Sequence, residues 1–313
     1  MKCVLCDGGD FDVVAAELRY EIQRKVVRCR QCGLSSLENP QDDSIDYRQP
    51  EYRQEHGPVL GRGSSPAELF AIMRPFQEAR VERVGSLLKP ECKVLEVGCA
   101  TGHFLDAIRD RCAEVTGVEP HKGDAAFART HCGLNVVDEP LETSDLPREH
   151  YDIIFLFQVF EHIADPLPFL ALCRDHLVSG GAVYLEVPNV DDALVAVFEI
   201  SAFRDFYYRL PHVYYYSPET LRRMMEAGGF PGRVRTAQYY SLFNHVHWLT
   251  VGAPQPDQTT AHSVPEWVLG SERQEATSRD IREFMDRANR EYGALLESRN
   301  VADRIAYCGY KGR

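Results

Sequence analysis

Long apolar runs are missing from this chain of 313 residues. No stretch approaches the roughly 20 consecutive apolar residues that a membrane-spanning helix requires, and the opening residues MKCVLCDGGDFD lack the apolar core of a signal peptide. The sequence also contains no internal repeat and no low-complexity tract. We therefore expect a globular, cytoplasmic protein without a membrane partner.

Basic residues are fewer than acidic residues in this chain. Lysine and arginine together number 35 against 47 aspartate and glutamate residues, which gives a formal net charge of −12. Nucleic-acid-binding proteins neutralise phosphates with basic patches, so this balance argues against a nucleic-acid partner, although a local basic patch is compatible with it. The length is sufficient for one large domain and an accessory module, and the sequence leaves the oligomeric state open.

The ten cysteines fall into two groups. Four form two C-x2-C pairs, Cys3 with Cys6 and Cys29 with Cys32, and Gly33 follows the second pair. Four thiolates in this pattern can enclose a tetrahedral zinc ion with no open position, which is the structural arrangement. The others lie in periodic, apolar surroundings, where we expect reduced thiols: Cys92, Cys99, Cys112, Cys132, Cys173 and Cys308.

We interpret residues 1–37 as a zinc-binding module of the ribbon type, in which the metal stabilises a segment without a core of its own. A redox-active cysteine pair is the alternative, and the lack of a neighbouring β-α-β unit disfavours it. Residues 38–64 are polar and are interpreted as a linker or lid, in which Tyr47 and Tyr52 close over a cofactor.

Residues 65–313 form the main domain in this interpretation. It begins with a helix or helix pair, kinked at Pro75, ahead of the alternating strands and helices. From Lys93 onward, short apolar runs alternate with amphipathic segments, which predicts a parallel sheet covered on both faces. An aromatic-rich insertion over 190–216 interrupts this alternation and is interpreted as a lid. A strand at 233–239, a helix at 278–296 and a strand at 304–310 are expected after it.

The segment 94–105 predicts a buried strand, a glycine-containing turn and a helix. Gly98 and Gly102 let a ligand approach the backbone, and a helix N-terminus offers N–H groups to a negative group. A second predicted strand ends at Glu119, 17 positions after Gly102, about where Rossmann folds place a ribose-binding carboxylate. The alternative is a tight turn beside a solvated Glu119. Ala100, in place of a fingerprint glycine, disfavours a dinucleotide site.

Together with the run 151–162 and the Gly180–Gly181 pair, these motifs resemble class I S-adenosylmethionine-dependent methyltransferases over about residues 92–230. The resemblance implies an enzyme with an α/β fold, in which a doubly wound, mostly parallel seven-stranded sheet follows the N-terminal zinc ribbon. It also implies S-adenosylmethionine as the cofactor, in addition to structural Zn2+.

The resemblance assigns cofactor contacts to four places. The amino-acid part lies against Glu96, Gly98, Cys99, Ala100 and Gly102. Glu119 holds the ribose hydroxyls, with Pro120 beside it, and the segment from Asp138 to Leu141 edges the adenine. Gln158 and Val159 lie beneath the sulfonium.

Two histidines are candidates for the general base. His162 follows the fourth strand of the domain, at the edge where ligands bind in open α/β folds, and it could accept a proton at neutral pH. His212 lies in the segment LPHVYYYS, which resembles H-x-x-[YF]-[YF]-S segments of small-molecule methyltransferases, and it is our first choice. For each, a structural histidine at a helix entry is the alternative.

Four residues are predicted to contact the acceptor. Tyr207 and Tyr215 belong to an aromatic segment that suits sugars or rings, although half of these aromatics could be core. Asn244 and His245 lie in the segment NHVHW, which offers polar donors on a helix or a strand. A metal site there lacks a third ligand.

The sequence therefore predicts methyl transfer to a small-molecule acceptor, with O- and C-methylation both open. The N-terminal cysteine pattern resembles that of deoxysugar C-methyltransferases, which implies a sugar, nucleotide sugar or natural product and a place in carbohydrate biosynthesis. Two alternatives remain: an RNA methyltransferase that grips RNA through the zinc module, and a catalytically idle binding protein that keeps the fold.

Overall fold

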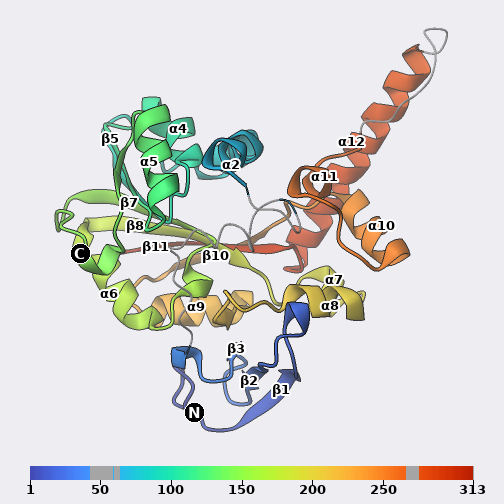
Figure 1. Ribbon diagram of the computed structural model, residues 1–313, viewed down its shortest axis with the longest axis horizontal. Coiled ribbons are helices and arrows are strands. Elements are labelled where there is room, and N and C mark those ends of the chain that lie inside the picture. Colours follow the sequence, from blue (N-terminus) through green and yellow to red (C-terminus); the bar gives the residue numbers. More distant parts are fainter. Residues whose placement is uncertain (43–58, 60–63, 266–274, 313) are drawn as a thin grey trace.

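The computed structural model describes residues 1–42, 59, 64–265 and 275–312 (Figure 1). Most of the predicted linker or lid, including Tyr47 and Tyr52, lies outside the described residues. In the described part of the chain, a large sheet organises the main domain and a smaller sheet lies at the N-terminus.

The strands of the large sheet span Lys93–Val97 (β4), Glu114–Val118 (β5), Asn135–Val137 (β6), Tyr151–Phe157 (β7), Leu177–Pro188 (β8), Gly232–Ala237 (β10) and Arg304–Tyr310 (β11). Within the described residues they form seven strands in the order β10-β11-β8-β7-β4-β5-β6. β11 is antiparallel to both neighbours, and the others run parallel to one another. This sheet confirms the predicted fold class.

Helices cover both faces of this sheet. They span Pro66–Met73 (α2), Gln77–Val84 (α3), His103–Ile108 (α4), Lys122–His131 (α5), Pro166–His176 (α6) and Pro218–Ala227 (α9). Side chains alternate along a strand, so Leu95 and Leu156 pack in one core cluster with α6 and α9, whereas Val94 and Phe155 pack in another with α3, α4 and α5. Figure 1 shows these helices on opposite sides of the sheet. The central strands therefore read as continuous apolar runs in the sequence.

Helices α2 and α3 form the helix pair that the sequence predicts ahead of the sheet. Ser65 caps α2: its Oγ accepts the N–H of Glu68 at 3.3 Å, and the Glu68 carboxylate accepts the N–H of Ser65 at 2.9 Å. Pro75 lies between the two helices, because proline has no N–H to continue the first one.

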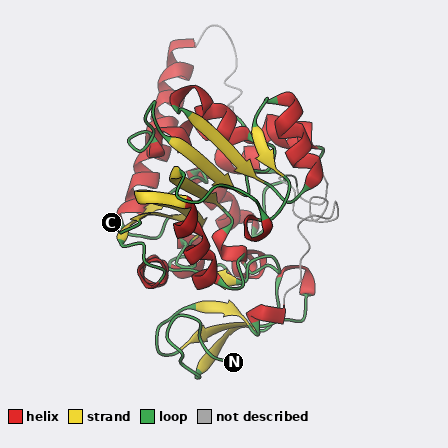
Figure 2. Cartoon of the chain, turned by 90° about the vertical axis from the view of Figure 1, so that its left-hand side faces the viewer, coloured by secondary structure: helices red, strands yellow, loops and turns green. Residues whose placement is uncertain are grey.

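The small sheet extends beyond the predicted module of residues 1–37. Its strands span Phe11–Ala15 (β1), Val26–Cys29 (β2), Ser35–Leu37 (β3) and Tyr214–Tyr215 (β9), and they pair antiparallel in the order β1-β2-β3-β9. β9 comes from the predicted aromatic insertion. Figure 2 shows this sheet at the lower end of the molecule, against the main domain. The module and the main domain therefore share a sheet.

The rest of the predicted insertion forms two short helices, Ala193–Ala196 (α7) and Ser201–Tyr207 (α8). The NHVHW segment lies in a helix, Leu242–Val251 (α10), so the helical alternative for it is the right one. Gln258–His262 (α11) and Glu275–Ser298 (α12) follow, and α12 extends away from the body of the molecule in Figure 1. Short 3-10 helices span Arg19–Glu21 (η1), Pro40–Asp42 (η2), Arg109–Arg111 (η3), Leu141–Thr143 (η4) and Phe160–His162 (η5).

The structure bears on two predictions from composition, one about the cysteines and one about membrane-spanning helices. All ten cysteines are free of disulfides, including the scattered ones expected to be reduced. Among the described residues, no helix combines the length and the apolar character needed to span a bilayer.

Candidate active site

A cavity of about 1120 Å³ lies where the carboxyl ends of the central parallel strands meet. Gly98 follows β4, Glu119 follows β5, Gln158 follows β7 and Pro188 ends β8, and all of them line it. Ligands in open α/β sheets bind at this edge. Arg19 from η1 of the N-terminal module also lines the cavity, as do Arg209 and His212 from the segment after α8.

The turn after β4 requires its glycines. Gly98 and Gly102 adopt φ of +73° and +77°, in the left-handed region. A Cβ atom on Gly98 would lie 2.5 Å from Cγ2 of Val159, and one on Gly102 would lie 2.5 Å from Cδ1 of Leu134. Ala100 adopts a positive φ of +47° without being glycine. The turn therefore approaches Val159, which follows β7, and Leu134, which follows α5, too closely for side chains at its two glycines.

Glu119 joins the turn after β4 to the turn after β5. Its carboxylate accepts the N–H of Ala100 at 2.8 Å and the N–H of His121 at 2.8 Å. The N–H groups of Gly98 and Cys99 donate to the carbonyl of Val118, at 2.7 and 3.1 Å. These bonds place a buried carboxylate at the cavity wall beside the glycine turn.

Glu96, at the end of β4, is a buried carboxylate that lines the cavity. Its Oε2 has no hydrogen-bond partner. Burial raises the pKa of Glu96 to about 8; the positive charge of Arg80 opposes this rise, and the negative charge of Glu119 adds to it. An orphaned buried carboxyl of this kind fits a cationic group of a ligand.

The predicted cofactor residues divide into two groups. Those that line the cavity are Glu96, Gly98, Ala100, Glu119, Pro120, Leu141, Gln158 and Val159. Cys99, Gly102 and Asp138 are outside the lining. Cys99 is buried beside Gly117, and Asp138 forms an ion pair with Arg129 at 3.3 Å. Sequence spacing identified the segments, but it could not give the direction of each side chain.

Glu161, His162 and His212 converge on the other side of the cavity. One ring nitrogen from each histidine and one carboxylate oxygen of Glu161 lie within 4.8 Å of one another, and the two imidazole rings are 5.1 Å apart between centroids. Nδ1 of His162 donates to the carbonyl of Pro211 at 2.5 Å, which directs Nε2 towards Glu161 at 3.9 Å. Both histidines line the cavity.

Glu161 is buried, and neither carboxylate oxygen has a hydrogen-bond partner. Burial raises its pKa to about 8, and the positive charges of Arg209 and Arg304 oppose this rise. Its backbone carbonyl accepts the N–H of Val213 at 2.9 Å, which fixes the His212 segment beside it. Glu161 directly precedes His162 in the sequence, but the sequence gave no sign that His212 would lie beside them.

Two of the four predicted acceptor residues line the cavity and two do not. Tyr207 and Asn244 line the cavity, and the buried hydroxyl of Tyr207 has no hydrogen-bond partner. Tyr215 instead packs in the core with Tyr208, and its hydroxyl bonds both the N–H and the carbonyl of Arg209 at 2.9 Å. Tyr215 therefore does not line the cavity, in contrast to its predicted contact with the acceptor.

His245 lies outside the cavity lining as well. Its Nδ1 is 2.8 Å from the hydroxyl of Tyr292, and its Nε2 is 3.3 Å from the amide of Gln238. Burial lowers its pKa to about 4. Successive residues of a helix point about 100° apart, and on α10 Asn244 lines the cavity whereas His245 points towards Tyr292. Arg19, Arg80 and Arg209 line it without having been predicted.

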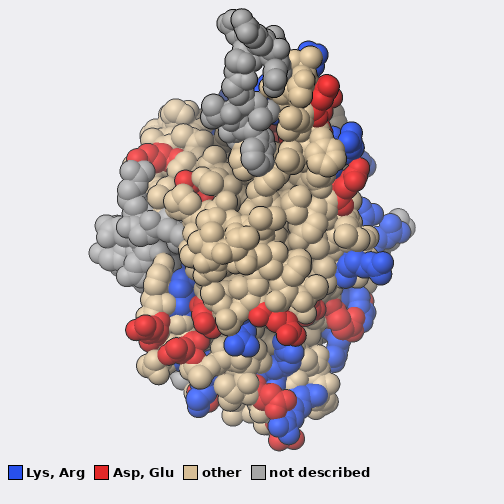
Figure 3. Space-filling model, turned by 90° about the vertical axis from the view of Figure 1, so that its right-hand side faces the viewer, with Lys and Arg blue, Asp and Glu red and all other residues tan. Residues whose placement is uncertain are grey.

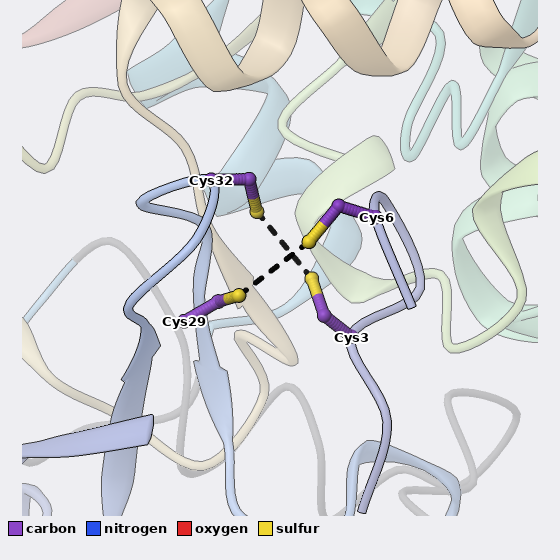
Figure 4. Close-up of side chains that lie close together, drawn as sticks. All are labelled: Cys3, Cys6, Cys29 and Cys32. Carbon is purple, nitrogen blue, oxygen red and sulfur yellow. Dashed lines mark hydrogen bonds between the residues drawn. The ribbon is translucent and has the colours of Figure 1, made fainter. Parts of the chain in front are cut away.

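The four cysteines of the N-terminal pairs converge (Figure 4). The Sγ atoms of Cys3 and Cys32 are 3.5 Å apart, as are those of Cys6 and Cys29, and all four lie within 4.8 Å of one another. Tetrahedral zinc with Zn–S bonds of about 2.3 Å holds its sulfurs about 3.8 Å apart. The cluster therefore fits a zinc ribbon.

Comparison with known proteins agrees with this fold. A family model described as a methyltransferase domain matches residues 69–232, just over half of the chain. The chain belongs to this family. The predicted methyltransferase class is thereby confirmed.

Similar curated proteins include two ubiquinone biosynthesis O-methyltransferases. The one from Pseudomonas savastanoi pv. phaseolicola is 32% identical over 114 residues, which cover 34% of this chain and 48% of the relative. The one from Rhizobium leguminosarum bv. trifolii is 27% identical over 158 residues, covering 48% and 63%. This methyltransferase domain thus matches about half to two thirds of the length of these relatives.

A solved structure shares the fold of the methyltransferase domain. The phosphoethanolamine N-methyltransferase 2 of Haemonchus contortus, in complex with S-adenosyl-L-methionine, superposes with a TM-score of 0.52 at 13% identity. The match covers 86% of this chain and 61% of that protein. At this identity the likeness concerns the fold alone.

S-adenosylhomocysteine, which carries the ammonium of the cofactor, provides a test of Glu96. With a folded pKa of about 8 against an ordinary 4.5, Glu96 is largely protonated at pH 7, so the free energy of unfolding falls as pH rises through this window. A bound ammonium lowers that pKa, so binding at pH 7 should release a proton, measured by calorimetry in buffers of different ionisation enthalpy. Glu96→Gln should abolish the release and Glu142→Gln, at the cavity wall, should keep it. Equal release in Glu96→Gln would contradict the assignment.

Metal analysis tests the cysteine cluster. We expect purified wild-type protein to contain one zinc ion per chain, and Cys29→Ser to contain little or none, because three thiolates leave an incomplete shell. Cys112→Ser, at a half-buried cysteine outside the cluster, should keep the metal. A folded wild-type protein without bound metal would exclude the zinc ribbon.

Proposed function

We propose that this chain transfers a methyl group from S-adenosylmethionine to a small-molecule acceptor. The observation that carries the proposal is the single cavity that joins the Glu96–Glu119 turn to the Glu161–His162–His212 cluster. A group-transfer enzyme needs a cofactor site and an acid-base site side by side. Donor and acceptor then meet in a near-attack geometry away from water.

The residues of the sheet edge suit the cofactor. Glu96 offers an orphaned carboxyl to the ammonium, and Glu119 offers its carboxylate to the ribose hydroxyls. Leu141 and Pro120 supply apolar wall for the adenine, and Gln158 and Val159 lie next to the glycine turn. When bound, S-adenosylmethionine supplies an electrophilic methyl group on its sulfonium.

The histidine cluster suits the acceptor. We propose His212 as the general base that takes the proton from an acceptor hydroxyl, and His162 as its neighbour, held by the carbonyl of Pro211. Glu161 lies beside both imidazoles. O-methylation is favoured by the names of the similar curated proteins.

The acceptor is proposed to be a sugar, nucleotide sugar or natural product. Phe203, Phe206 and Trp248 form an aromatic wall of the cavity, and their rings contact one another at centroid distances of 5.0 to 6.4 Å. Tyr207 and Asn244 add polar groups to this wall. Flat apolar surface with a few fixed polar groups suits rings that carry hydroxyls.

The zinc ion is proposed to be structural, because four thiolates leave no coordination position for a substrate. We also retain residues 1–37 as the module, 38–64 as the linker or lid and 65–313 as the methyltransferase domain. The RNA-binding alternative is disfavoured by the charge of −12, and the face in Figure 3 intersperses basic and acidic side chains.

Substitution of the histidines distinguishes the hypothesis of an active methyltransferase from that of a catalytically idle binding protein. His212→Ala should lower kcat by roughly 10²- to 10⁴-fold, the usual contribution of a general base, while the Kd of S-adenosylhomocysteine stays unchanged. His162→Ala should lower kcat as well, and His247→Ala, on α10 outside the cavity, should not. The assay is S-adenosylhomocysteine formation with a panel of sugars, nucleotide sugars and phenols. Full activity of His212→Ala would refute this base, and no turnover of wild type with any acceptor would favour the idle protein.

A further inference from the structure

Two arginines from distant parts of the chain line the acceptor side of the cavity. Arg19 belongs to η1 in the N-terminal module, and Arg209 follows α8 in the main domain. The N–H of Arg19 donates to the carbonyl of Tyr208 at 2.7 Å, and its Nε donates to the carbonyl of Phe206 at 2.6 Å. The guanidinium lies 3.5 Å from the centre of the Phe206 ring. Arg19 is thus fixed in place by its neighbours.

Arg209 is fixed through its backbone. The hydroxyl of Tyr215 accepts the N–H of Arg209 and donates to its carbonyl, each at 2.9 Å. The Nε atom of Arg209 is buried and has no hydrogen-bond partner. A buried guanidinium donor without an acceptor is unfavourable unless a ligand supplies one.

In the described part of the chain, no carboxylate forms an ion pair with either arginine. Arg80 and Arg304, which also line the cavity, differ in this respect because both lie within 4.0 Å of Glu186, at 3.1 and 3.9 Å. Burial and the nearby positive charge of Arg209 lower the pKa of Arg19 to about 10. The two guanidinium charges therefore repel each other, and among the described residues no ion-paired carboxylate offsets them.

Against the effect of burial, the positive charge of Arg209 lowers the pKa of Glu161, but this carboxyl does not neutralise the two arginines at pH 7. Burial raises the pKa of Glu161 to about 8, so the carboxyl is largely protonated there. An oxyanion would relieve the repulsion, since guanidinium forks bind phosphate and carboxylate with paired, charge-assisted hydrogen bonds.

We infer that Arg19 and Arg209 together bind an anionic group of the acceptor, a phosphate ester or a carboxylate. The inference rests on the proposed function and narrows its acceptor class to molecules that carry such an oxyanion. Tyr207 and Asn244 line the same wall and can bond the neutral part of the acceptor between this anion and His212. The N-terminal module thereby contributes directly to acceptor specificity.

Calorimetry on protein saturated with S-adenosylhomocysteine tests this site, with inorganic phosphate and acetate as probes. We expect at least one to bind, and the tighter probe indicates whether the group is a phosphate ester or a carboxylate. Arg19→Gln and Arg209→Gln should each weaken binding by roughly tenfold to hundredfold, the range for hydrogen bonds to charged groups. Arg30→Gln, which removes an exposed charge of the same module, should leave it unchanged.

Three results would overturn the inference. They are no binding of either anion, binding that both arginine variants retain in full, and binding that saturation with S-adenosylhomocysteine abolishes, which would assign the anion site to the cofactor. Arg19→Lys and Arg209→Lys keep the charge and should give intermediate affinities. Failure of wild type to bind S-adenosylhomocysteine would instead contradict the proposed function.

Discussion

The pairing of β3 with β9 joins the N-terminal module to the methyltransferase domain through its backbone. Ser35 and Ser36 lie opposite Tyr215 and Tyr214, and the N–H of Leu37 donates to the carbonyl of Val213 at 2.9 Å. β9 has only two residues, too few to be stable alone. On one side β9 is held by the folded module. On the other side the chain just after β8 contacts the residue that follows β9, because the N–H of Val190 donates to the carbonyl of Tyr216 at 2.9 Å.

This pairing positions much of the wall that we propose for the acceptor. His212 directly precedes the paired segment, Val213 bonds the backbone of Glu161, and Tyr215 bonds the backbone of Arg209. The module adds Arg19 to the same wall. The cofactor side differs, because its glycine turn and Glu119 are held by hydrogen bonds among adjacent parallel strands. The two halves of the cavity thus depend on different parts of the fold.

The sequence predicted best the features that depend on residues close together in the chain. The strand, turn and helix at 93–108 follow from an apolar run, two glycines and an amphipathic segment, and β11 has the predicted bounds of 304–310. The cysteine spacing similarly predicted the convergence of four sulfurs, because each pair forms its own tight turn. These features depend on neighbouring residues, whose chemistry the sequence displays directly.

What the sequence did not predict depends on long-range packing. Tyr207 and Tyr215 look alike in an aromatic run, yet Tyr207 lines the cavity whereas Tyr215 is buried in a core cluster with Leu18, Leu37 and Tyr208. Arg19 belongs to no motif, and it reaches the cavity only because the module packs against the segment after α8. Side-chain direction and the docking of the module are properties of the whole fold, which local periodicity does not encode.

The central claim is that the folded module holds the acceptor wall. Amide hydrogen exchange with and without metal removal by a strong chelator tests it most directly, since exchange reports local opening segment by segment. The account predicts that loss of the metal accelerates exchange in β2, β3 and the segment 211–216 together, while β4 and β5 stay protected. Unchanged protection at 211–216 in a protein whose cysteine turns have opened would contradict it.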